Sequence, residues 1–416
     1  MEALPLFKNN KERVYFSLFI FIILISNLYL HFIDYNKITK NEVFSTNAIV
    51  VNSYEKNNYT VLKLKTDDFT FFTSSKLSSS YEKLQHINIF IVTKNITFYQ
   101  YLKGFYAKSF NITKLESSAN NTTKIKIANF ISTQHLNKDI SSLYNALFLA
   151  IPINEKIREV CSSFGISHLV AISGFHLGVI SFVLYFLIHI LYCKMHQNYF
   201  PYRNKRFDIS IIVSLILFCY LLFVDLVPSL LRAFVMFVFA LLMLRNNIKV
   251  LSFETLFIVV VIILALFPKL FFSLSLWFSV AGVFYIFLFL HYFSTLNKYI
   301  QFIIFNFWIY FAINPIVHYF FGATSFEQLY SPILTILFTL FYPLVVFLHL
   351  IQSGSIFDSL LSDMINYQIY SVEVFTPFLF LLFYISISLI SIFNKKAFIL
   401  LNVLLLSFGV FLFIQI

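Results

Sequence analysis

Long apolar segments make up most of this chain, and one polar stretch separates the first of them from the rest. Residues 14–33 are almost wholly apolar and long enough to span a bilayer as a helix. From residue 167 onward polar positions are scarce, and we expect spans at residues 168–193, 209–226, 228–245, 251–267, 271–293, 299–321, 330–351, 376–393 and 397–416. The pattern predicts a polytopic α-helical membrane protein of about ten spans.

The polar stretch, residues 34–160, follows a different pattern. Its short runs are rich in β-branched and aromatic residues, and Asn, Asp and Ser separate them. We expect strands at residues 59–65, 69–73, 87–93 and 105–112. Several short strands in so short a stretch suit a small barrel, of which an OB-like barrel is one candidate.

The end of the polar stretch predicts a helix. Residues 141–166 have one weakly apolar face and a central Pro152, so we expect an amphipathic helix on the membrane surface or against the bundle. Four parts follow: an N-terminal membrane anchor (1–33), an extracytoplasmic OB-like β domain (34–130), an amphipathic helical connector (131–166) and a multi-span bundle (167–416).

Composition agrees with a membrane protein and excludes several other classes. Hydrophobic residues make up 59% of the chain and charged residues 12%, about half the usual charged fraction of a soluble domain. This excludes a cytosolic enzyme, a disordered chain and a secreted disulfide scaffold. The net charge is +11, and residues 34–160 hold sixteen basic against ten acidic residues. Such an excess favours a polyanionic partner, although a general preference for lysine would also produce it.

The distribution of basic residues also predicts the topology. Three basic residues precede the first span, which places the N-terminus in the cytoplasm and the polar stretch outside the inner membrane. Strict counting then puts Lys395 and Lys396 outside as well. Prolines and a glycine interrupt residues 299–351, so a re-entrant or broken segment there would restore agreement. The alternative is a C-terminal part that ignores the rule.

Polar residues and glycines gather in Gly165–Gly178 (GISHLVAISGFHLG). Polar groups at membrane depth are costly and normally face protein or water. Gly174 and Gly178 would let another helix approach closely. His168 and His176 would make only an incomplete metal site, because no carboxylate or cysteine completes a familiar spacing.

Three other interpretations of this segment are open. Ser173 lies in a short run similar to the nucleophile motif of intramembrane serine proteases, and it would need a histidine from another span. The candidates are His291, His318 and His349. The segment would alternatively line a path for a polar substrate, or be a close-packed helix start with hydrogen-bonded histidines.

The same segment resembles the hallmark of the ComEC-type competence family, the inner-membrane channels for transforming DNA. The matching residues are His168, Leu169, Ala171, Ile172, Ser173, Gly174, His176 and Gly178. Arg232-Ala233 resembles the family's second landmark, an Arg-Ala pair that opens a span. A third landmark is kept only in part, at Ser279 and Ala281, and Gly322–Phe326 with Tyr330–Pro332 resembles the family's late loop.

The resemblance implies a channel component that takes in single-stranded DNA during natural transformation, with an OB-like domain ahead of the bundle. Many members end in a metallo-β-lactamase-like domain, but this chain has no His-x-His-x-Asp-His run and no Walker A sequence. We therefore expect no catalytic residues, no metal and no cofactor. The expected partners are single-stranded DNA, a periplasmic DNA receptor, a cytoplasmic helicase-like ATPase, membrane lipid and further copies of the chain in a homo-oligomer.

Particular side chains are expected to serve this role. The residues predicted to line the channel are His168, Ser173, His176, Arg232, Asn314 and His318. Arg232 is the only arginine deep in an apolar span, and a pair with Asp225 is its alternative role. On the β domain, the residues predicted to contact DNA are Lys63, Lys65, Lys103, Tyr99 and Tyr106. A small-solute or lipid transporter is the remaining alternative, but it would not need a basic, aromatic-rich outer domain.

Overall fold

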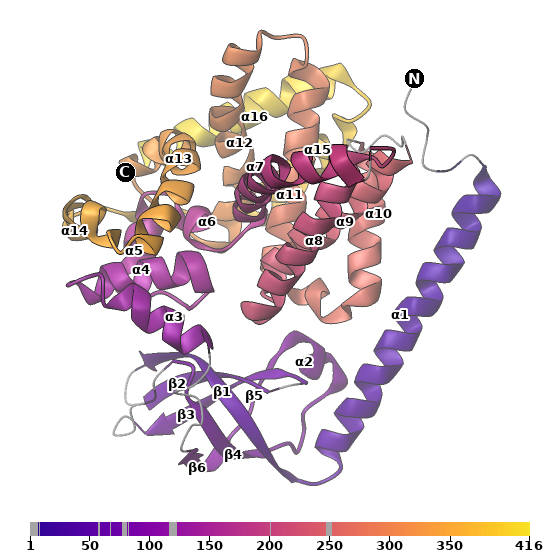
Figure 1. The fold of residues 1–416 in the computed structure, drawn as a ribbon. Coiled ribbons are helices and arrows are strands. Elements are labelled where there is room, and N and C mark those ends of the chain that lie inside the picture. Colours follow the sequence, from indigo (N-terminus) through magenta and orange to yellow (C-terminus); the bar gives the residue numbers. More distant parts are fainter. Residues whose placement is uncertain are drawn as a thin grey trace. The chain divides into compact units, whose positions relative to one another are not determined.

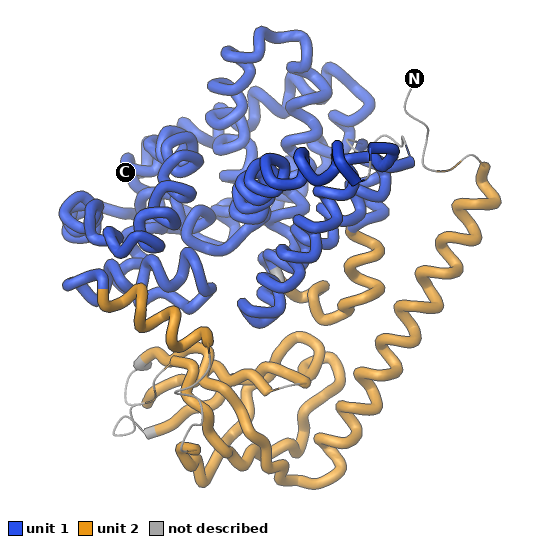
Figure 2. Tube along the Cα trace, viewed as in Figure 1, with its two compact units in different colours: residues 1–6, 134–259, 274–416 blue, residues 7–133, 260–273 orange. Residues whose placement is uncertain are grey.

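The computed structural model describes residues 7, 9–56, 59–66, 68–76, 81, 83–115, 123–199, 201–246 and 252–416. The chain forms two compact units, shown in Figure 2. Residues 134–259 and 274–416 make up the helical unit, and residues 7–133 and 260–273 make up the β unit.

A six-stranded sheet is the centre of the β unit (Figure 1). Its strands are β1 (Val43–Lys56), β2 (Tyr59–Lys65), β3 (Thr70–Lys76), β4 (His86–Val92), β5 (Phe105–Tyr106) and β6 (Ser109–Lys114). Their order is β5-β3-β2-β1-β4-β6. Since β5 and β6 follow each other directly, the two ends of this order meet, and the Thr73 hydroxyl donates to Ser109 Oγ across them at 2.6 Å.

The alternating pattern explains which strand faces are buried. On β2, Leu62 and Leu64 are fully buried, whereas Lys63 and Lys65 between and beside them are half-exposed. Ile87, Ile89 and Ile91 of β4 form the opposite wall of the same apolar cluster. The strand predicted at 59–65 coincides with β2, and those predicted at 69–73 and 87–93 are β3 and β4 with ends shifted by one to three residues. The region predicted as one strand at 105–112 is two short strands, β5 and β6.

The longest strand was not expected from the sequence. The first half of β1 pairs with β4, and its second half pairs with β2 beyond an irregularity between Val50 and Asn52. Its inward positions include Thr46 and Ala48, so the apolar alternation along it is weak. Pairing with strands on both sides supplies what local propensity does not.

The helices of the chain occupy the predicted apolar segments. Among the described residues, seven helices are long and apolar enough to cross a membrane: α1 (Asn10–Thr39), α7 (Gly174–Tyr199), α8 (Lys205–Phe223), α11 (Leu274–Phe293), α12 (Lys298–Phe320), η3 with α13 (Phe326–Leu350, of which α13 is Ser331–Leu350) and α16 (Lys395–Ile414). Three shorter apolar helices fill the other predicted spans: α9 (Pro228–Arg245), α10 (Phe253–Leu266) and α15 (Phe378–Ile390). The chain is a polytopic helical membrane protein with a small β sheet.

Two predicted helical segments are divided. The helix expected at 141–166 is two helices, α4 (Lys138–Leu149) and α5 (Glu155–Ser163), because Ala150 adopts a left-handed backbone and Pro152 follows. The span expected at 168–193 begins at Gly174, after the short helix α6 (Ser167–Val170). Neither predicted span within 299–351 is broken, since α12 and α13 continue through their prolines, and residues 321–330 connect the two helices. A re-entrant segment in this part stays a prediction.

Several apolar clusters of described residues hold the helical unit together. Ile209, Val213 and Leu217 of α8 pack with Leu177 of α7 and Leu230 of α9. A second cluster, centred on aromatic residues of α11, α12, α15 and α16, contains Tyr285, Phe289, Trp308, Tyr384 and Phe398.

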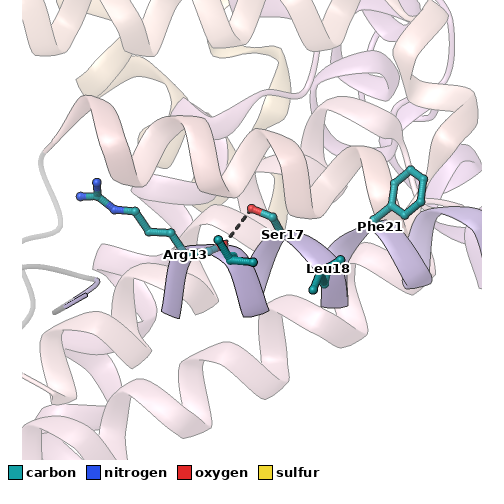
Figure 3. Close-up of a pocket in the computed structure, with 5 residues that line it drawn as sticks. Arg13, Ser17, Leu18 and Phe21 are labelled. Carbon is teal, nitrogen blue, oxygen red and sulfur yellow. Dashed lines mark hydrogen bonds between the residues drawn. The ribbon is translucent and has the colours of Figure 1, made fainter. Parts of the chain in front are cut away.

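A shallow, mostly apolar pocket of about 410 Å³ lies along the first turns of α1 (Figure 3). Its lining is Arg13, Val14, Ser17, Leu18 and Phe21. The Ser17 hydroxyl donates to the backbone carbonyl of Arg13 at 2.8 Å. The pocket therefore offers few polar groups for a ligand, and the chemistry-bearing residues lie elsewhere.

Candidate channel lining and nucleic-acid interface

The polar segment, Gly165–Gly178, starts where α5 ends. Gly165 has a positive φ of 66°, which residues with a side chain rarely adopt. The next amide, Ile166 N–H, donates to the Cys161 carbonyl at 2.8 Å. This glycine stop turns the chain into α6. A second break at residues 171–173 then allows α7 to start at Gly174.

His176 lies in the first turn of α7 and is fully buried. Its Nδ1 accepts the backbone N–H of Ser173 at 3.2 Å, so a neutral ring carries its proton on Nε2. The ring contacts Tyr342 edge-on, with centroids 4.7 Å apart, and Phe338 at 5.5 Å, both on α13. Ser173 is half-buried beside it, with Oγ 3.3 Å from the same Nδ1. His168, by contrast, is exposed and lies 3.4 Å from Thr335 Oγ1.

Arg232 is buried on α9 and links this helix to α11. Its side chain is only 4% exposed, and Nη1 donates to the backbone carbonyl of Ser275. Within the described chain, Nε makes no hydrogen bond and no carboxylate lies within ion-pair distance. An arginine buried without a counter-charge is costly, which is typical of a functional residue rather than a stabilising one.

Neighbours of Arg232 on α9 make the contacts with the polar segment. The Ser229 hydroxyl donates to the Ile172 carbonyl. A Cβ placed on Gly174 would lie 3.4 Å from the Cβ of Ala233, an ordinary van der Waals distance, so α7 and α9 meet here without requiring a glycine. At Gly178 a Cβ would meet no atom within 4 Å, so neither glycine is required by close packing in this structure. The first two sequence landmarks are therefore in contact, although about 60 residues separate them.

The loop before α13 contacts the start of the segment from its other side, through Ser325 and Ser331 of the predicted late loop and through Gln328, which the sequence did not indicate. The Ser331 hydroxyl donates to the Gly165 carbonyl at 2.9 Å. The Gln328 amide donates to the carbonyls of Ser162 at 3.2 Å and Ala323 at 2.6 Å. Ser325 donates to the Ser163 carbonyl. These bonds satisfy the open carbonyls at the end of α5, so the loop fixes where the polar segment begins.

We predict that Gln328→Ala lowers the thermal stability of the protein. The Ser162 and Ala323 carbonyls would each lose one hydrogen bond, which costs about 0.5–1.5 kcal/mol per bond, and the Ser162 carbonyl keeps the Gly165 N–H as a donor. The measurement is the thermal midpoint of the purified protein in detergent. Gln301→Ala on α12 is the matched control, since the Gln301 side chain makes no hydrogen bond within the described chain. Equal midpoints for the two variants would contradict the role given to Gln328.

Asn314 and His318 lie in a different part of the helical unit. Both are buried on α12. His318 Nδ1 lies 3.2 Å from the Val374 carbonyl and 3.4 Å from Thr324 Oγ1, and its ring contacts Phe408 of α16 at 6.2 Å. The six predicted lining residues thus divide into one group around α6, α7 and α9 and a second pair on α12.

The same contacts bear on the protease interpretation. His318 Nδ1 is within hydrogen-bond distance of Thr324 and Val374, at the short β7–β8 pair (Ala323–Thr324 with Val372–Glu373). His349 Nδ1 lies 2.6 Å from the Val345 carbonyl. Within the described chain, neither His318 nor His349 makes a hydrogen bond with Ser173. The geometry therefore does not favour a nucleophile built on Ser173 with His318 or His349.

On the β unit, two of the predicted DNA-contacting residues lie in one cross-strand row. Lys63 of β2 is the register partner of Phe72 on β3, and Phe72 is the partner of Tyr106 on β5. The Lys63 ammonium lies 5.8 Å from the centroid of the Phe72 ring. Tyr106 is 55% exposed, and its hydroxyl lies 2.7 Å from Ser74 Oγ. We call Lys63, Phe72 and Tyr106 the outer row. Lys65 lies two residues after Lys63 on β2.

The other two predicted residues share one face of α2 (Phe98–Lys103). Lys103 Nζ lies 5.9 Å from the Tyr99 ring, which is 58% exposed. Phe272 packs edge-on against Tyr99 at 5.2 Å. Nearby, the Lys269 ammonium donates to the Asp68 carbonyl at 2.7 Å, and burial lowers the pKa of Lys269 to about 8. Lys269 thus stays mostly protonated at neutral pH and adds positive charge under α2.

Comparison with known proteins was made for the whole chain. A family model described as Competence protein matches residues 152–415. The match covers well over half of the chain and includes the polar segment, Arg232 and the loop that contains Gln328. No curated protein and no solved structure matches the chain.

Proposed function

As the chain belongs to the competence protein family, we propose that it is the inner-membrane channel component that takes in single-stranded DNA during natural transformation. A role in DNA uptake holds for the family. The passage of a single strand through this bundle is the specific part of the proposal.

The observation that carries the proposal is the buried guanidinium of Arg232 on α9, the helix whose Ser229 and Ala233 contact the polar segment. A strand of DNA has one negative charge per phosphate and cannot cross hydrocarbon unaided. It needs polar and cationic groups at membrane depth. Arg232 has no carboxylate within ion-pair distance in the described chain, and it lies where two family landmarks meet. A buried cation with no carboxylate beside it in the described chain suits an anion that is present only during transport.

The β unit suits capture of the strand. Its strand order, with β1 shared between two neighbours and β3 parallel to β5, fits the OB-like barrel that we expect for this domain. The outer row and the α2 face offer exposed aromatic rings beside lysines, which suits stacking of bases and contact with phosphates. We place this unit outside the inner membrane and the N-terminus in the cytoplasm, in keeping with the positive-inside rule.

The proposal includes partners. Uptake against the membrane barrier needs an energy source, and we expect a helicase-like ATPase on the cytoplasmic side. A periplasmic receptor would deliver the DNA, lipid would surround the bundle, and further copies of the chain would form a homo-oligomer.

The test is deletion of the gene. We expect transformation to fall below detection while DNA still binds to the cell surface, because the proposed step is entry into the cytoplasm. The measurements are transformant counts and the fraction of labelled DNA that becomes resistant to external nuclease. Complementation with the wild-type gene is the control. Normal transformation in the deletion strain would contradict the proposal, and loss of a small solute or lipid from the cytoplasm instead would favour the transporter alternative.

A further inference from the structure

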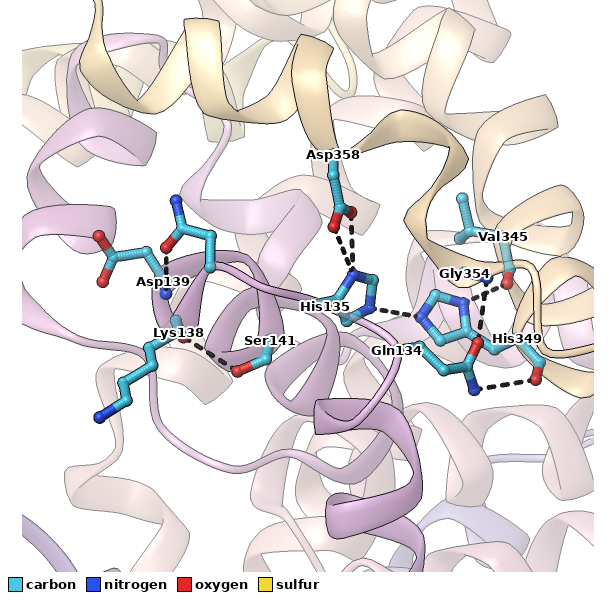
Figure 4. Close-up of polar contacts among 10 residues, drawn as sticks. Gln134, His135, Lys138, Asp139, Ser141, Val345, His349, Gly354 and Asp358 are labelled. Atoms are coloured by element: carbon cyan, nitrogen blue, oxygen red, sulfur yellow. Dashed lines mark hydrogen bonds and ion pairs between the residues drawn. The ribbon is translucent and has the colours of Figure 1, made fainter.

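A cluster of buried titratable groups lies apart from the proposed channel lining, all of it in the helical unit (Figure 4). Gln134 and His135 are the first residues of that unit after its boundary at 133/134. His349 comes from the last turn of α13, and Asp358 is the first residue of α14 (Asp358–Asn366). We call His135, His349 and Asp358 the histidine cluster.

The three side chains form a continuous chain of hydrogen bonds. His135 Nδ1 lies 2.8 and 3.1 Å from the two carboxylate oxygens of Asp358. The Nε2 atoms of His135 and His349 are 3.0 Å apart. At the far end, His349 Nδ1 lies 2.6 Å from the Val345 carbonyl. The His135 side chain is fully buried, and that of Asp358 is 21% exposed.

The protons needed by this arrangement can be counted. The Val345 carbonyl is only an acceptor, so His349 Nδ1 must carry a proton. A carboxylate is also only an acceptor, so one proton must lie between Asp358 and His135 Nδ1. The two Nε2 atoms at 3.0 Å need a third proton, because two lone pairs would otherwise face each other. Two neutral imidazoles hold two protons, so the cluster contains one more.

The surroundings favour that extra proton as a charge beside Asp358. Among the described residues, a further titratable group that faces the rings is Tyr144 of α4, stacked on His135 at 4.7 Å and tilted against His349 at 4.4 Å. Burial, and then the charge of Asp358, raise the pKa of the Tyr144 hydroxyl, so it stays neutral. Asp139 on α4 lies 3.6 Å from Lys156 of α5. Within the described part of the chain, Asp358 is the carboxylate in contact with the rings.

Gln134 and Gly354 fix the backbone on both sides of the histidine cluster. The Gln134 amide donates to the His349 carbonyl at 3.2 Å, and its oxygen accepts the Gly354 N–H at 3.0 Å. A Cβ on Gly354 would lie 2.7 Å from that amide oxygen and 2.9 Å from His349 Nε2. Only glycine leaves room there for Gln134 and His349 together.

We propose that His135 and His349 bind one shared proton, with Asp358 as its counter-charge, and that this proton fixes the start of the helical unit to the turn between α13 and α14. Without the proton, the two Nε2 atoms repel and the contact between residues 134–149 and residues 349–358 loosens. The site takes a proton as its ligand and makes the attachment of α4 dependent on pH. The sign follows from the proton count: because the closed form holds the extra proton, it is favoured at low pH and lost as pH rises.

The test is hydrogen exchange of the full chain in detergent, followed by mass spectrometry, at pH 6 and pH 8 with correction for the intrinsic exchange rate. We expect protection of residues 134–149 to fall about tenfold or more between pH 6 and pH 8, as a charge-assisted bond is lost. Asp358→Asn removes the counter-charge and should leave protection low at both pH values. Asp363→Asn, an exposed carboxylate of the same helix, is the matched control and should keep the wild-type dependence.

A second variant separates the proton from the packing of the rings. In His349→Gln, the amide donates to His135 Nε2 without an extra proton, so protection should be high at both pH values. Equal wild-type protection at pH 6 and pH 8, or wild-type pH dependence in Asp358→Asn, would overturn the proposal. So would protection at pH 8 that rises with added zinc and falls with a chelator, because the ligand between the two Nε2 atoms would then be a metal.

Discussion

Arg232→Met is expected to reduce transformation about a hundredfold or more while leaving the protein as stable as the wild type, or more stable. In most proteins, loss of function after a buried substitution follows from loss of folding. The opposite relation is expected here, because the Arg232 guanidinium has incomplete hydrogen bonding and no carboxylate within ion-pair distance in the described chain. Methionine fills a similar volume without a charge.

The physical reason is the cost of burying a cation. Replacing a buried charge by an apolar side chain of similar size is often neutral or stabilising by about 1–4 kcal/mol. A phosphate that passes this position would lose its charge-assisted hydrogen bonds, which are about twice as strong as neutral ones. Stability and uptake should therefore change in opposite directions.

The measurements are the thermal midpoint of the purified variant, its amount in the membrane, and the transformation frequency of the strain. Arg245→Gln is the matched control, because Arg245 is exposed at the end of the same helix, where its guanidinium lies 4.6 Å from the Phe207 ring. Arg232→Lys should keep part of the activity, since it retains the charge. Normal transformation with Arg232→Met would show that phosphates do not meet this residue.

The helical part of the fold was predictable because its signal is strong and local. A stretch of some twenty apolar residues has few structures open to it in a bilayer, so the apolar segments and the helices coincide within a few residues. Helix ends were less predictable. Whether Gly174 begins a helix depends on a backbone break at residues 171–173, which hydropathy does not encode.

The β unit shows where local pattern fails. The strand β1 alternates correctly, but Thr46 and Ala48 occupy inward positions, and neither identifies a strand by itself. Its pairing with β2 and β4 decides the structure. Phe72 was missed for a related reason: its place between Lys63 and Tyr106 depends on strand register, which the sequence does not state.

The polar contacts in the helical unit were the least predictable. His135 and His349 meet although they are 214 residues apart, and Gln328 reaches Ser162 across 166 residues. A single sequence, considered by itself, contains no sign of such pairs. The family landmarks were predictable as motifs, but the contact between Gly174 and Ala233 required the structure.

The other large effect is expected on the outer row, where Tyr106→Ala should weaken binding of single-stranded DNA about 5- to 150-fold. Stacking of a base on an aromatic ring contributes about 1–3 kcal/mol, and each 1.4 kcal/mol is a factor of ten in affinity. Tyr106 is the most exposed ring of the row and has Phe72 as its register partner. The measurement is fluorescence anisotropy of a labelled oligothymidine with the full chain in detergent, at one fixed salt concentration.

Two controls separate stacking from damage to the sheet. Tyr106→Phe keeps the ring and loses only the contact with Ser74 Oγ, so it should bind nearly as the wild type does. Phe110→Ala removes a ring of similar exposure, 48%, that stacks on Phe90 at 5.7 Å instead of lying in the outer row. It should leave DNA affinity unchanged. An equal loss in Phe110→Ala and Tyr106→Ala would mean that the affinity follows the stability of the sheet.

Salt dependence then distinguishes the role of the lysine from that of the rings. Lys63→Gln should reduce the slope of log K against log salt by about 0.7, the value for one phosphate contact on a single strand, whereas Tyr106→Ala should leave the slope unchanged. Because Lys63 and Tyr106 lie on either side of Phe72, a strand that stacks on Tyr106 brings a phosphate within reach of the ammonium. If Lys63→Gln changes the slope while Tyr106→Ala has no effect, the surface attracts the backbone without stacking the bases, and the outer row is an electrostatic patch rather than a stacking platform.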